Sequence, residues 1–228
     1  MLLGGLQKMT LLDFPGHVAC TVFTAGCNFR CPFCHNTPLV TGPDSPGYSV
    51  DEFFPFLEKR RGLLDGVAIT GGEPLLQHDI VPFIERIRSM GYFVKLDTNG
   101  AFPEKLREIL ERGLADYVAM DIKNCQEKYE LSAGADGILP NVEESVRLLM
   151  ADTVPYEFRT TLVDELHEPD DFRKIGQWLQ GASQYFIQGF VDSGNILASG
   201  MHAASPKKTE QCLASVRIYL PQAQLRGQ

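Results

Sequence analysis

The sequence predicts an α/β fold in which six strand and helix units curl into a partial (β/α)6 TIM-like barrel. Six runs rich in β-branched and aromatic residues alternate with segments whose apolar residues recur at helical spacing. The chain has 228 residues, of which 44% are hydrophobic, so it can bury one sizeable core. Because no linker-like or low-complexity tract divides it, residues 1–228 are expected to form a single domain.

The six predicted strands follow one another at regular intervals along the chain. In order they are residues 17–24, 66–70, 92–97, 117–123, 156–163 and 184–191. Strands that alternate with helices lie parallel and are joined by right-handed crossovers. Because a complete eight-fold ring needs about 250 residues, these six units favour part of a barrel, and a doubly wound open sheet is the alternative.

Helices are predicted between the strands. Their apolar faces contain Phe53, Phe56 and Leu57; Ile80, Phe83, Ile84 and Ile87; Leu106, Ile109 and Leu110; Val142, Val146 and Leu149; Phe172, Ile175 and Leu179. Two helices are expected to start at Ser49 and Asn141, each followed three residues later by a glutamate that completes a capping box. The barrel core is expected over about residues 10–191, with residues 206–228 as a C-terminal helix and extension.

The charge balance limits the classes of partner. Lysine and arginine total 21 against 29 aspartates and glutamates, a net charge of -8, so we expect neither nucleic acid nor an anionic membrane as a partner. No apolar run approaches ~18 residues and no basic leader precedes an apolar segment, which predicts a cytoplasmic protein. The basic cluster at residues 59–61 is either a solvated helix end or a local docking patch.

The strongest chemical signal is Cys27-x-x-x-Cys31-x-x-Cys34, directly after the first predicted strand. Three thiolates in one short loop can bind zinc or an iron–sulfur cluster. Structural zinc needs a fourth ligand, and His35 follows Cys34 so closely that chelation by both is awkward. A four-iron cluster on three cysteines leaves one iron open for a ligand. Taken alone, the cysteines leave the cluster, zinc and buried thiols as alternatives.

Polar residues follow the other predicted strands. The second strand leads into Thr70-Gly71-Gly72-Glu73-Pro74, where the glycines permit close backbone approach and the carboxylate can receive an ammonium group. The later strands end in or carry Asp97, Thr98, Asn99, Asp121, Lys123, Arg159 and Gln188. Because ligands of parallel α/β proteins bind at the carboxyl ends of the strands, these residues are expected to form one site with the cysteines.

The cysteine spacing, with Phe33 before the last cysteine, together with Gly71-Gly72-Glu73-Pro74, resembles the radical S-adenosylmethionine (SAM) superfamily. The likeness extends over about residues 10–190. It implies a barrel of the radical SAM type, a 4Fe-4S cluster on Cys27, Cys31 and Cys34, and SAM at the fourth iron. It also implies oxidoreductase chemistry, in which the reduced cluster cleaves SAM and a 5′-deoxyadenosyl radical abstracts hydrogen.

Further motifs are similar to the activating enzymes of glycyl radical enzymes. They are Asp13-Phe14-Pro15-Gly16, Cys34-His35-Asn36, Asp97-Thr98-Asn99-Gly100 and Asp121-x-Lys123. The chain resembles most the single-domain activating protein of anaerobic ribonucleoside-triphosphate reductase, and also that of pyruvate formate-lyase. This resemblance implies a glycyl radical enzyme as protein substrate and a low-potential electron donor such as flavodoxin or ferredoxin.

The resemblance also assigns residues. Gly71, Gly72 and Glu73 would hold the methionine amino group of SAM and Lys123 its carboxylate. Phe33 and Asn99 belong to motifs at the cofactor, and Arg159 would lie near the nucleoside. Asp97, Thr98 and Asp121 would bind a monovalent cation beside SAM, and Gln188 stands where the pyruvate formate-lyase activase has a histidine.

Two other functions remain as alternatives. One is a radical SAM enzyme that acts on a small molecule, as in deazapurine synthesis, or on a peptide. The other is a zinc-binding structural protein, which would explain the cysteines but not the polar strand ends. Of the remaining cysteines, Cys20 and Cys212 are predicted to be core residues, and Cys125, two residues beyond Lys123, is the spare thiol that could face the site.

Overall fold

The computed structural model describes residues 1–41, 47–192 and 194–227, which contain one sheet of eight strands. The order of the strands across the sheet is their order in the chain: β1 (Leu3–Thr10), β2 (Ala19–Thr24), β3 (Gly66–Gly71), β4 (Phe93–Thr98), β5 (Tyr117–Asp121), β6 (Tyr156–Leu162), β7 (Tyr185–Gly189) and β8 (Gln224–Arg226). β1 is antiparallel to β2, and the other neighbouring pairs are parallel. The six predicted strands correspond to β2–β7 and are confirmed.

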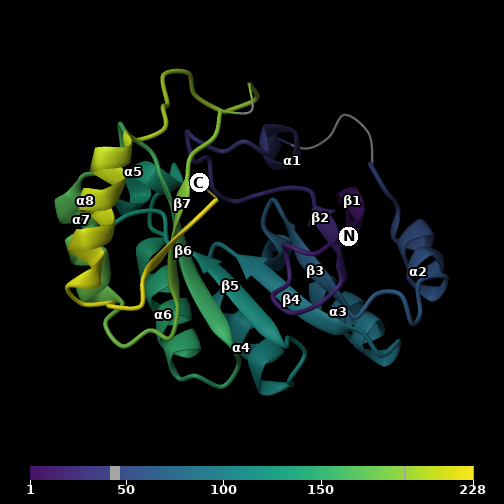
Figure 1. The fold of residues 1–228 in the computed structure, drawn as a ribbon. Coiled ribbons are helices and arrows are strands. Elements are labelled where there is room, and N and C mark those ends of the chain that lie inside the picture. The colour runs from purple at the N-terminus through teal and green to yellow at the C-terminus, as the bar shows by residue number, and fades with distance from the viewer. Residues whose placement is uncertain (42–46, 193, 228) are drawn as a thin grey trace.

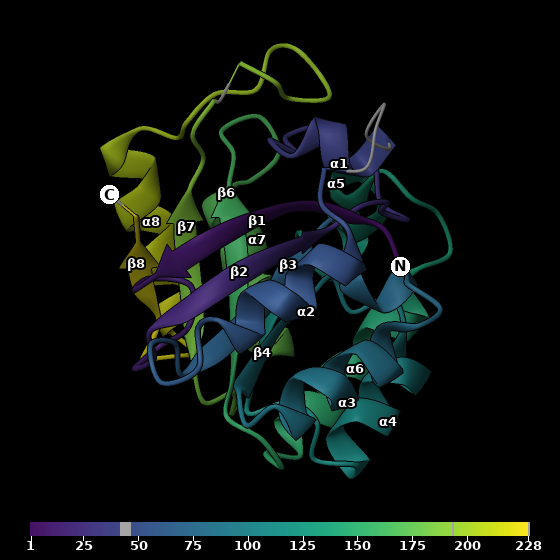
Figure 2. The ribbon, with the colours of Figure 1, turned by 90° about the vertical axis from the view of Figure 1, so that its right-hand side faces the viewer.

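The sheet curves into an open partial barrel with helices on its outer face (Figures 1 and 2). β1 and β8 are the two edges, and within the described ranges no strand pairing joins them. The strand order runs across the sheet without the reversal that defines a doubly wound fold, so the open doubly wound alternative is wrong.

The helices connect successive strands and cover the sheet. They are α1 (Thr37–Thr41), α2 (Val50–Glu58), α3 (Ile80–Ser89), α4 (Pro103–Glu111), α5 (Tyr129–Ala133), α6 (Leu139–Met150), α7 (Pro169–Trp178) and α8 (Pro206–Arg217), with short 3-10 turns η1 (Pro74–Leu76) and η2 (Gln126–Lys128). α8 is the predicted C-terminal helix. None of the described helices has the length and apolar character needed to cross a bilayer.

One predicted helix start is confirmed and the other is wrong. Ser49 Oγ accepts a hydrogen bond from the Glu52 N–H at 3.1 Å and the Glu52 carboxylate accepts one from the Ser49 N–H at 3.0 Å, which is the expected capping box. Asn141 lies inside α6, which begins two residues earlier because Pro140 fits the first turn of a helix. Asn141 instead donates a side-chain hydrogen bond to the carbonyl of Ala101.

The edge strands β1 and β8 were not predicted. β1 contains the adjacent glycines Gly4 and Gly5 and a run of exposed residues at 7–9, so it lacks the alternation typical of a strand. β8 is only three residues long, and it is held by Arg226, whose guanidinium donates to Glu157 at 2.5 and 2.8 Å. Both strands therefore depend on pairing with distant segments.

The pleat of the strands separates an apolar core from a polar barrel interior. On β4, Val94 and Leu96 belong to the apolar core, whereas Lys95 and Asp97 lie on the opposite face. β6 alternates in the same way and carries Arg159 on the inner face. The apolar core thus lies between the sheet and the helices, and charged side chains fill the inside of the curve.

The basic cluster at residues 59–61 lies at the end of α2. The Arg61 guanidinium is 2.9 Å from Glu58 and donates to the carbonyl of Met90 at 3.0 Å, while Arg60 lies over the ring of Phe56. These local contacts favour the solvated helix end over the docking patch.

Candidate active site

Every residue that the sequence assigned to the site lines one cavity of about 340 Å³ at the carboxyl ends of the parallel strands. These residues are Cys27, Cys31, Phe33, Cys34, Gly71, Gly72, Glu73, Asp97, Thr98, Asn99, Asp121, Lys123, Arg159 and Gln188. They come from loops and strands along most of the chain. The parallel strand order is what brings them together, because it turns all the carboxyl ends to one side.

The cysteine loop leaves β2 and is anchored at several points of its backbone. The Gly26 N–H donates to the carbonyl of Leu39 at 2.6 Å, and the Arg30 N–H donates to that of Ala133 at 2.9 Å. Cys31 is buried, while Cys27 and Cys34 are partly exposed, and all three are free thiols. Burial raises the pKa of the Cys31 thiol to about 12, so in the absence of a metal it is protonated at neutral pH.

Gly71 and Gly72 allow the end of β3 to touch the backbone that leads into the cysteine loop. A methyl carbon on Gly71, whose φ is +117°, would lie 2.4 Å from the Thr24 nitrogen, and one on Gly72 would lie 2.0 Å from the Gly26 oxygen. Two hydrogen bonds close this contact, from the Gly72 N–H to Thr24 at 2.9 Å and from the Glu73 N–H to Gly26 at 2.8 Å. The glycines therefore fix the cysteine loop against β3.

Glu73 is a buried carboxylate without a cationic partner among the described residues. It accepts hydrogen bonds from Thr98 Oγ1 at 2.7 Å, from the Asn99 N–H at 2.7 Å and from the Leu75 N–H at 3.0 Å. Burial raises the pKa of Glu73 to about 7, although these hydrogen bonds act in the opposite direction. An ammonium group in the cavity would stabilise its ionised form.

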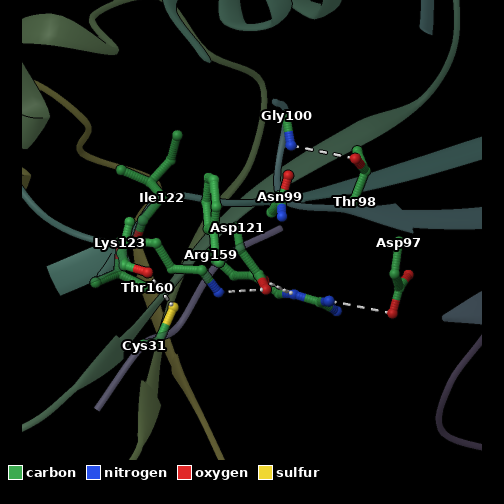
Figure 3. A network of polar contacts seen from close by, with 12 residues as sticks. Cys31, Asp97, Thr98, Asn99, Gly100, Asp121, Ile122, Lys123, Arg159 and Thr160 are labelled. Atoms are coloured by element: carbon green, nitrogen blue, oxygen red, sulfur yellow. Dashed lines mark hydrogen bonds and ion pairs between the residues drawn. The ribbon is translucent and has the colours of Figure 1, made fainter. Parts of the chain in front are cut away.

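A row of ion-paired side chains crosses the cavity (Figure 3). Arg159 lies between two carboxylates, with Nη2 3.1 Å from Asp97 and Nε 2.6 Å from Asp121. Lys123 Nζ is 2.9 Å from the other oxygen of Asp121. Burial alone would raise the pKa of Asp121, but Arg159 and Lys123 outweigh it and hold that pKa well below its usual value.

Asn99 and Phe33 connect the strand ends to the cysteine loop. Asn99 Nδ2 donates to the side chain of Asn28 at 2.9 Å and lies 3.9 Å from Cys27 Sγ. The ring of Phe33 lies beside Lys123, with Nζ 6.0 Å from the ring centroid. Both residues thus contact groups of the cavity directly.

The spare thiol Cys125 does not face the cavity. Asn124 turns the chain after β5 by donating to the carbonyl of Leu166 at 3.0 Å and to Ser132 at 2.9 Å. The buried Cys125 Sγ then lies 3.5 Å from Asp171. Cys20 and Cys212 are fully buried core residues, as predicted.

Several lining residues were missed by the sequence analysis. They include Gln7 on β1, Thr21 and Phe23 on β2, and Thr161 on β6. The alternation of β6 predicts that Thr161, two residues after Arg159, lies on the same face, so it was detectable. Gln7 was not, because its strand was not predicted.

The donor set fits an iron–sulfur cluster better than a single ion. In the part of the chain that the structure describes, no three His, Cys, Asp or Glu side chains are grouped to hold one metal ion. Structural zinc requires four close ligands, whereas three soft thiols spaced around a cavity suit a larger cluster. Cys27, Cys31 and Cys34 are the residues that would hold it.

A comparison with protein families matches residues 21–174 to the model of the radical SAM superfamily. The chain belongs to the radical SAM superfamily. Radical SAM enzymes use a 4Fe-4S cluster and SAM, which agrees with the thiol donors and the polar strand ends of this cavity.

The relatives of this radical SAM chain are named after different activities. A Methanocaldococcus jannaschii protein named as a glycyl-radical enzyme activating enzyme is 33% identical over 194 residues, 83% of this chain and 80% of that one. A pyruvate formate-lyase-activating enzyme of Listeria monocytogenes is 28% identical and covers 77% of this chain and 74% of its own. A 7-carboxy-7-deazaguanine synthase of Hyperthermus butylicus is 38% identical over 96 residues, 42% of this chain and 40% of that one.

Solved structures share the radical SAM fold. Streptococcus suis SuiB bound to S-adenosylmethionine superposes with a TM-score of 0.69 at 12% identity over 90% of this chain. The chain spans about half of the SuiB chain, 48%. At this identity the likeness concerns the fold alone.

Proposed function

We propose that this radical SAM enzyme activates a glycyl radical enzyme: it reductively cleaves SAM and generates a glycyl radical on a protein partner. The observation that carries the proposal is that the three motif cysteines share one cavity with two oppositely charged groups. One is the buried carboxylate of Glu73, which no cation of the described residues pairs with, and the other is a set of ion pairs with an excess of positive charge that ends at Lys123. The names of the relatives that match most of the chain support the same activity.

The cavity has the two charges that recognise an α-amino acid. Glu73 has no cationic partner in the part of the chain that the structure describes, and it would receive the ammonium of the methionine part of SAM. Lys95, Arg159 and Lys123 supply three positive charges against two from Asp97 and Asp121, which leaves one cation for the carboxylate. Lys123 is our candidate, because among these paired side chains it lies nearest to Phe33 and the cysteines.

When bound, the cluster and SAM supply the electron transfer and the hydrogen abstraction of the reaction. The protein positions them and excludes water. Phe29 and Phe33 are buried in the wall of the cavity, and Cys31 is buried beside α5, where its Sγ lies 3.5 Å from the carbonyl oxygen of Ala133. Such a dry wall protects reactive species from side reactions.

A protein segment would enter the cavity from the side between the two edge strands of the sheet. The lining extends to Gln7 on the edge strand β1 and to Gln188 on β7, which is next to the other edge strand. This extent of the lining supports a peptide loop as substrate, and we propose anaerobic ribonucleoside-triphosphate reductase as the partner and flavodoxin or ferredoxin as the electron donor.

A second candidate function is synthesis of a deazapurine, which the partial likeness to 7-carboxy-7-deazaguanine synthase favours. That likeness covers less than half of the chain. An enzyme of this kind would act on a small molecule within the same cavity.

The test uses cluster-reconstituted protein, kept anaerobic and reduced, with SAM and each glycyl radical enzyme of the source organism. We expect the doublet of a glycyl radical in the electron paramagnetic resonance spectrum of one partner. The doublet should be absent when the target glycine of that partner is replaced by alanine. SAM cleavage without a radical on any such partner would reject activation and favour the small-molecule function.

A further inference from the structure

Lys95 is a buried lysine inside the barrel that enters the proposed function only through its charge. It lies on β4, two residues before Asp97 and on the same face, and only 3% of its surface is exposed. Its ammonium is paired with Asp97 Oδ1. Burying an ammonium costs free energy unless a counter-ion compensates its lost hydration, and the Asp97 carboxylate is the counter-ion of Lys95.

The pairing completes the hydrogen bonding of two carboxylates. Asp97 binds Lys95 through Oδ1 and Arg159 through Oδ2, and Asp121 binds Arg159 through Oδ1 and Lys123 through Oδ2. Each of the four carboxylate oxygens thus accepts from a protein cation. These are the carboxylates for which the family resemblance implies a bound monovalent cation.

Without the Lys95 ammonium, Asp97 Oδ1 would be a buried oxygen that lacks its charged partner. The local balance would be two cations against two carboxylates, with no excess positive charge to receive the carboxylate of SAM. A small monovalent cation beside Asp97 would restore both the contact and the charge, because hard cations prefer oxygen ligands. Lys95 is a residue of the protein itself, and it places the same charge at the same oxygen.

We propose that Lys95 is an internal cation that replaces a bound alkali-metal ion at Asp97, so that this chain binds SAM without one. Lys95 does not line the cavity, and it acts through Asp97, which in turn holds Arg159. It is therefore a positioning residue. The proposal rests on the proposed function only in that the ligand is SAM.

The experiment compares the reconstituted wild type with Lys95→Met, which keeps the stem of the side chain and removes its charge. Each protein is studied in potassium chloride and in choline chloride at equal ionic strength. Equilibrium dialysis measures the dissociation constant of SAM, and thermal unfolding without SAM measures direct cation binding. Lys128→Met is the matched control, because Lys128 pairs with the buried Asp171 at 2.6 Å outside the cavity.

The wild type and Lys128→Met should bind SAM with less than about a twofold difference between the two salts. Lys95→Met should lose about tenfold or more of its SAM affinity in choline chloride, the scale of a lost charged hydrogen bond, and regain most of it in potassium chloride. Its unfolding midpoint should also rise in potassium chloride relative to choline chloride. Lys95→Arg, which keeps the cation, should behave as the wild type.

Two results would overturn the proposal. One is a wild type that needs potassium or sodium to bind SAM, and this comparison decides even if Lys95→Met does not fold. The other is a folded Lys95→Met whose SAM affinity and unfolding midpoint are the same in both salts. If the wild type binds no SAM in either salt, the proposed function fails, while the salt dependence of the unfolding midpoint of Lys95→Met still tests the internal cation.

Discussion

Glu73 accepts a hydrogen bond from the backbone N–H of Asn99 at 2.7 Å, which joins the turn after β3 to the turn after β4. A second bond, from Thr98 Oγ1, holds the other carboxylate oxygen. The carboxyl group is thus fixed in the cavity by neutral donors, and no cation among the described residues pairs with it. This arrangement prepares Glu73 for a cationic ligand group and leads to the first two predictions.

Replacing Glu73 with glutamine should weaken SAM binding by about tenfold to a hundredfold, because the amide keeps the shape and loses the charge that pairs with the ammonium. Equilibrium dialysis on reconstituted protein measures this. The same substitution at Glu157, which is also buried but pairs with Arg226 away from the cavity, is the control for SAM binding. Equal SAM affinity of Glu73→Gln and wild type would remove Glu73 from the ligand site.

The raised pKa of Glu73 predicts a specific dependence of stability on pH. Its pKa is about 7 in the folded chain, against about 4.3 for an unperturbed glutamate. Between about pH 4 and 7 the folded state therefore holds a proton that the unfolded state has released. The contribution of Glu73 to stability is fully present below about pH 4 and is lost as the pH rises through about 7. Urea unfolding without SAM should show this loss in the wild type and less of it in Glu73→Gln. SAM affinity should rise over the same range.

Lys123→Met should weaken SAM binding by about 1.5 to 3 kcal/mol, the range of a charge-assisted hydrogen bond, if Lys123 pairs with the ligand carboxylate. Asp121 keeps Arg159 as a partner, so the protein should still fold. Isothermal titration with SAM measures the effect, with Lys128→Met as the lysine control. An unchanged SAM affinity would transfer this role to another cation.

Gly72→Ala should destabilise the fold by about 1 to 3 kcal/mol, because its methyl group would press on the Gly26 carbonyl that leads into the cysteine loop. Gly189→Ala is the matched control at the end of β7, where a new methyl carbon would lie 3.6 Å from the Gly227 oxygen, its nearest neighbour among the described residues. That variant should change the unfolding free energy by less than about 0.5 kcal/mol. Similar effects of the two substitutions would contradict the proposed contact between β3 and the loop.

The strand order and the residues of the cavity were predictable because both follow from local pattern and one rule of topology. Runs rich in β-branched and aromatic residues mark β2–β7. Because these strands are parallel, Glu73, Asp97 and Asp121 lie at the same edge of the sheet. The pairing of Arg159 with both aspartates was not predictable, since it depends on side-chain directions across three strands. Lys95 was missed for the same reason: a single lysine in a strand gives no sign of which charge it will meet.

Other features depend on contacts between distant segments. β1 and β8 are weak strands by composition and form only against β2 and β7. Gly71 and Gly72 predict a close backbone approach, but the sequence does not indicate that the approaching segment is the backbone that leads into the cysteine loop. Cys125 is two residues from a cavity lysine in sequence, yet the turn at Asn124 directs it into the core.

We propose that Cys27, Cys31 and Cys34 would hold a cluster beside the residues proposed to bind SAM in the same cavity. The most direct measurement is an electron paramagnetic resonance titration of the reduced, reconstituted protein with SAM, beside Cys31→Ala and the control Cys125→Ala. We predict a cluster signal in the wild type and in Cys125→Ala that changes when SAM is added, and loss of this signal in Cys31→Ala. A cluster signal that SAM leaves unchanged, or that survives intact in Cys31→Ala, would contradict the account.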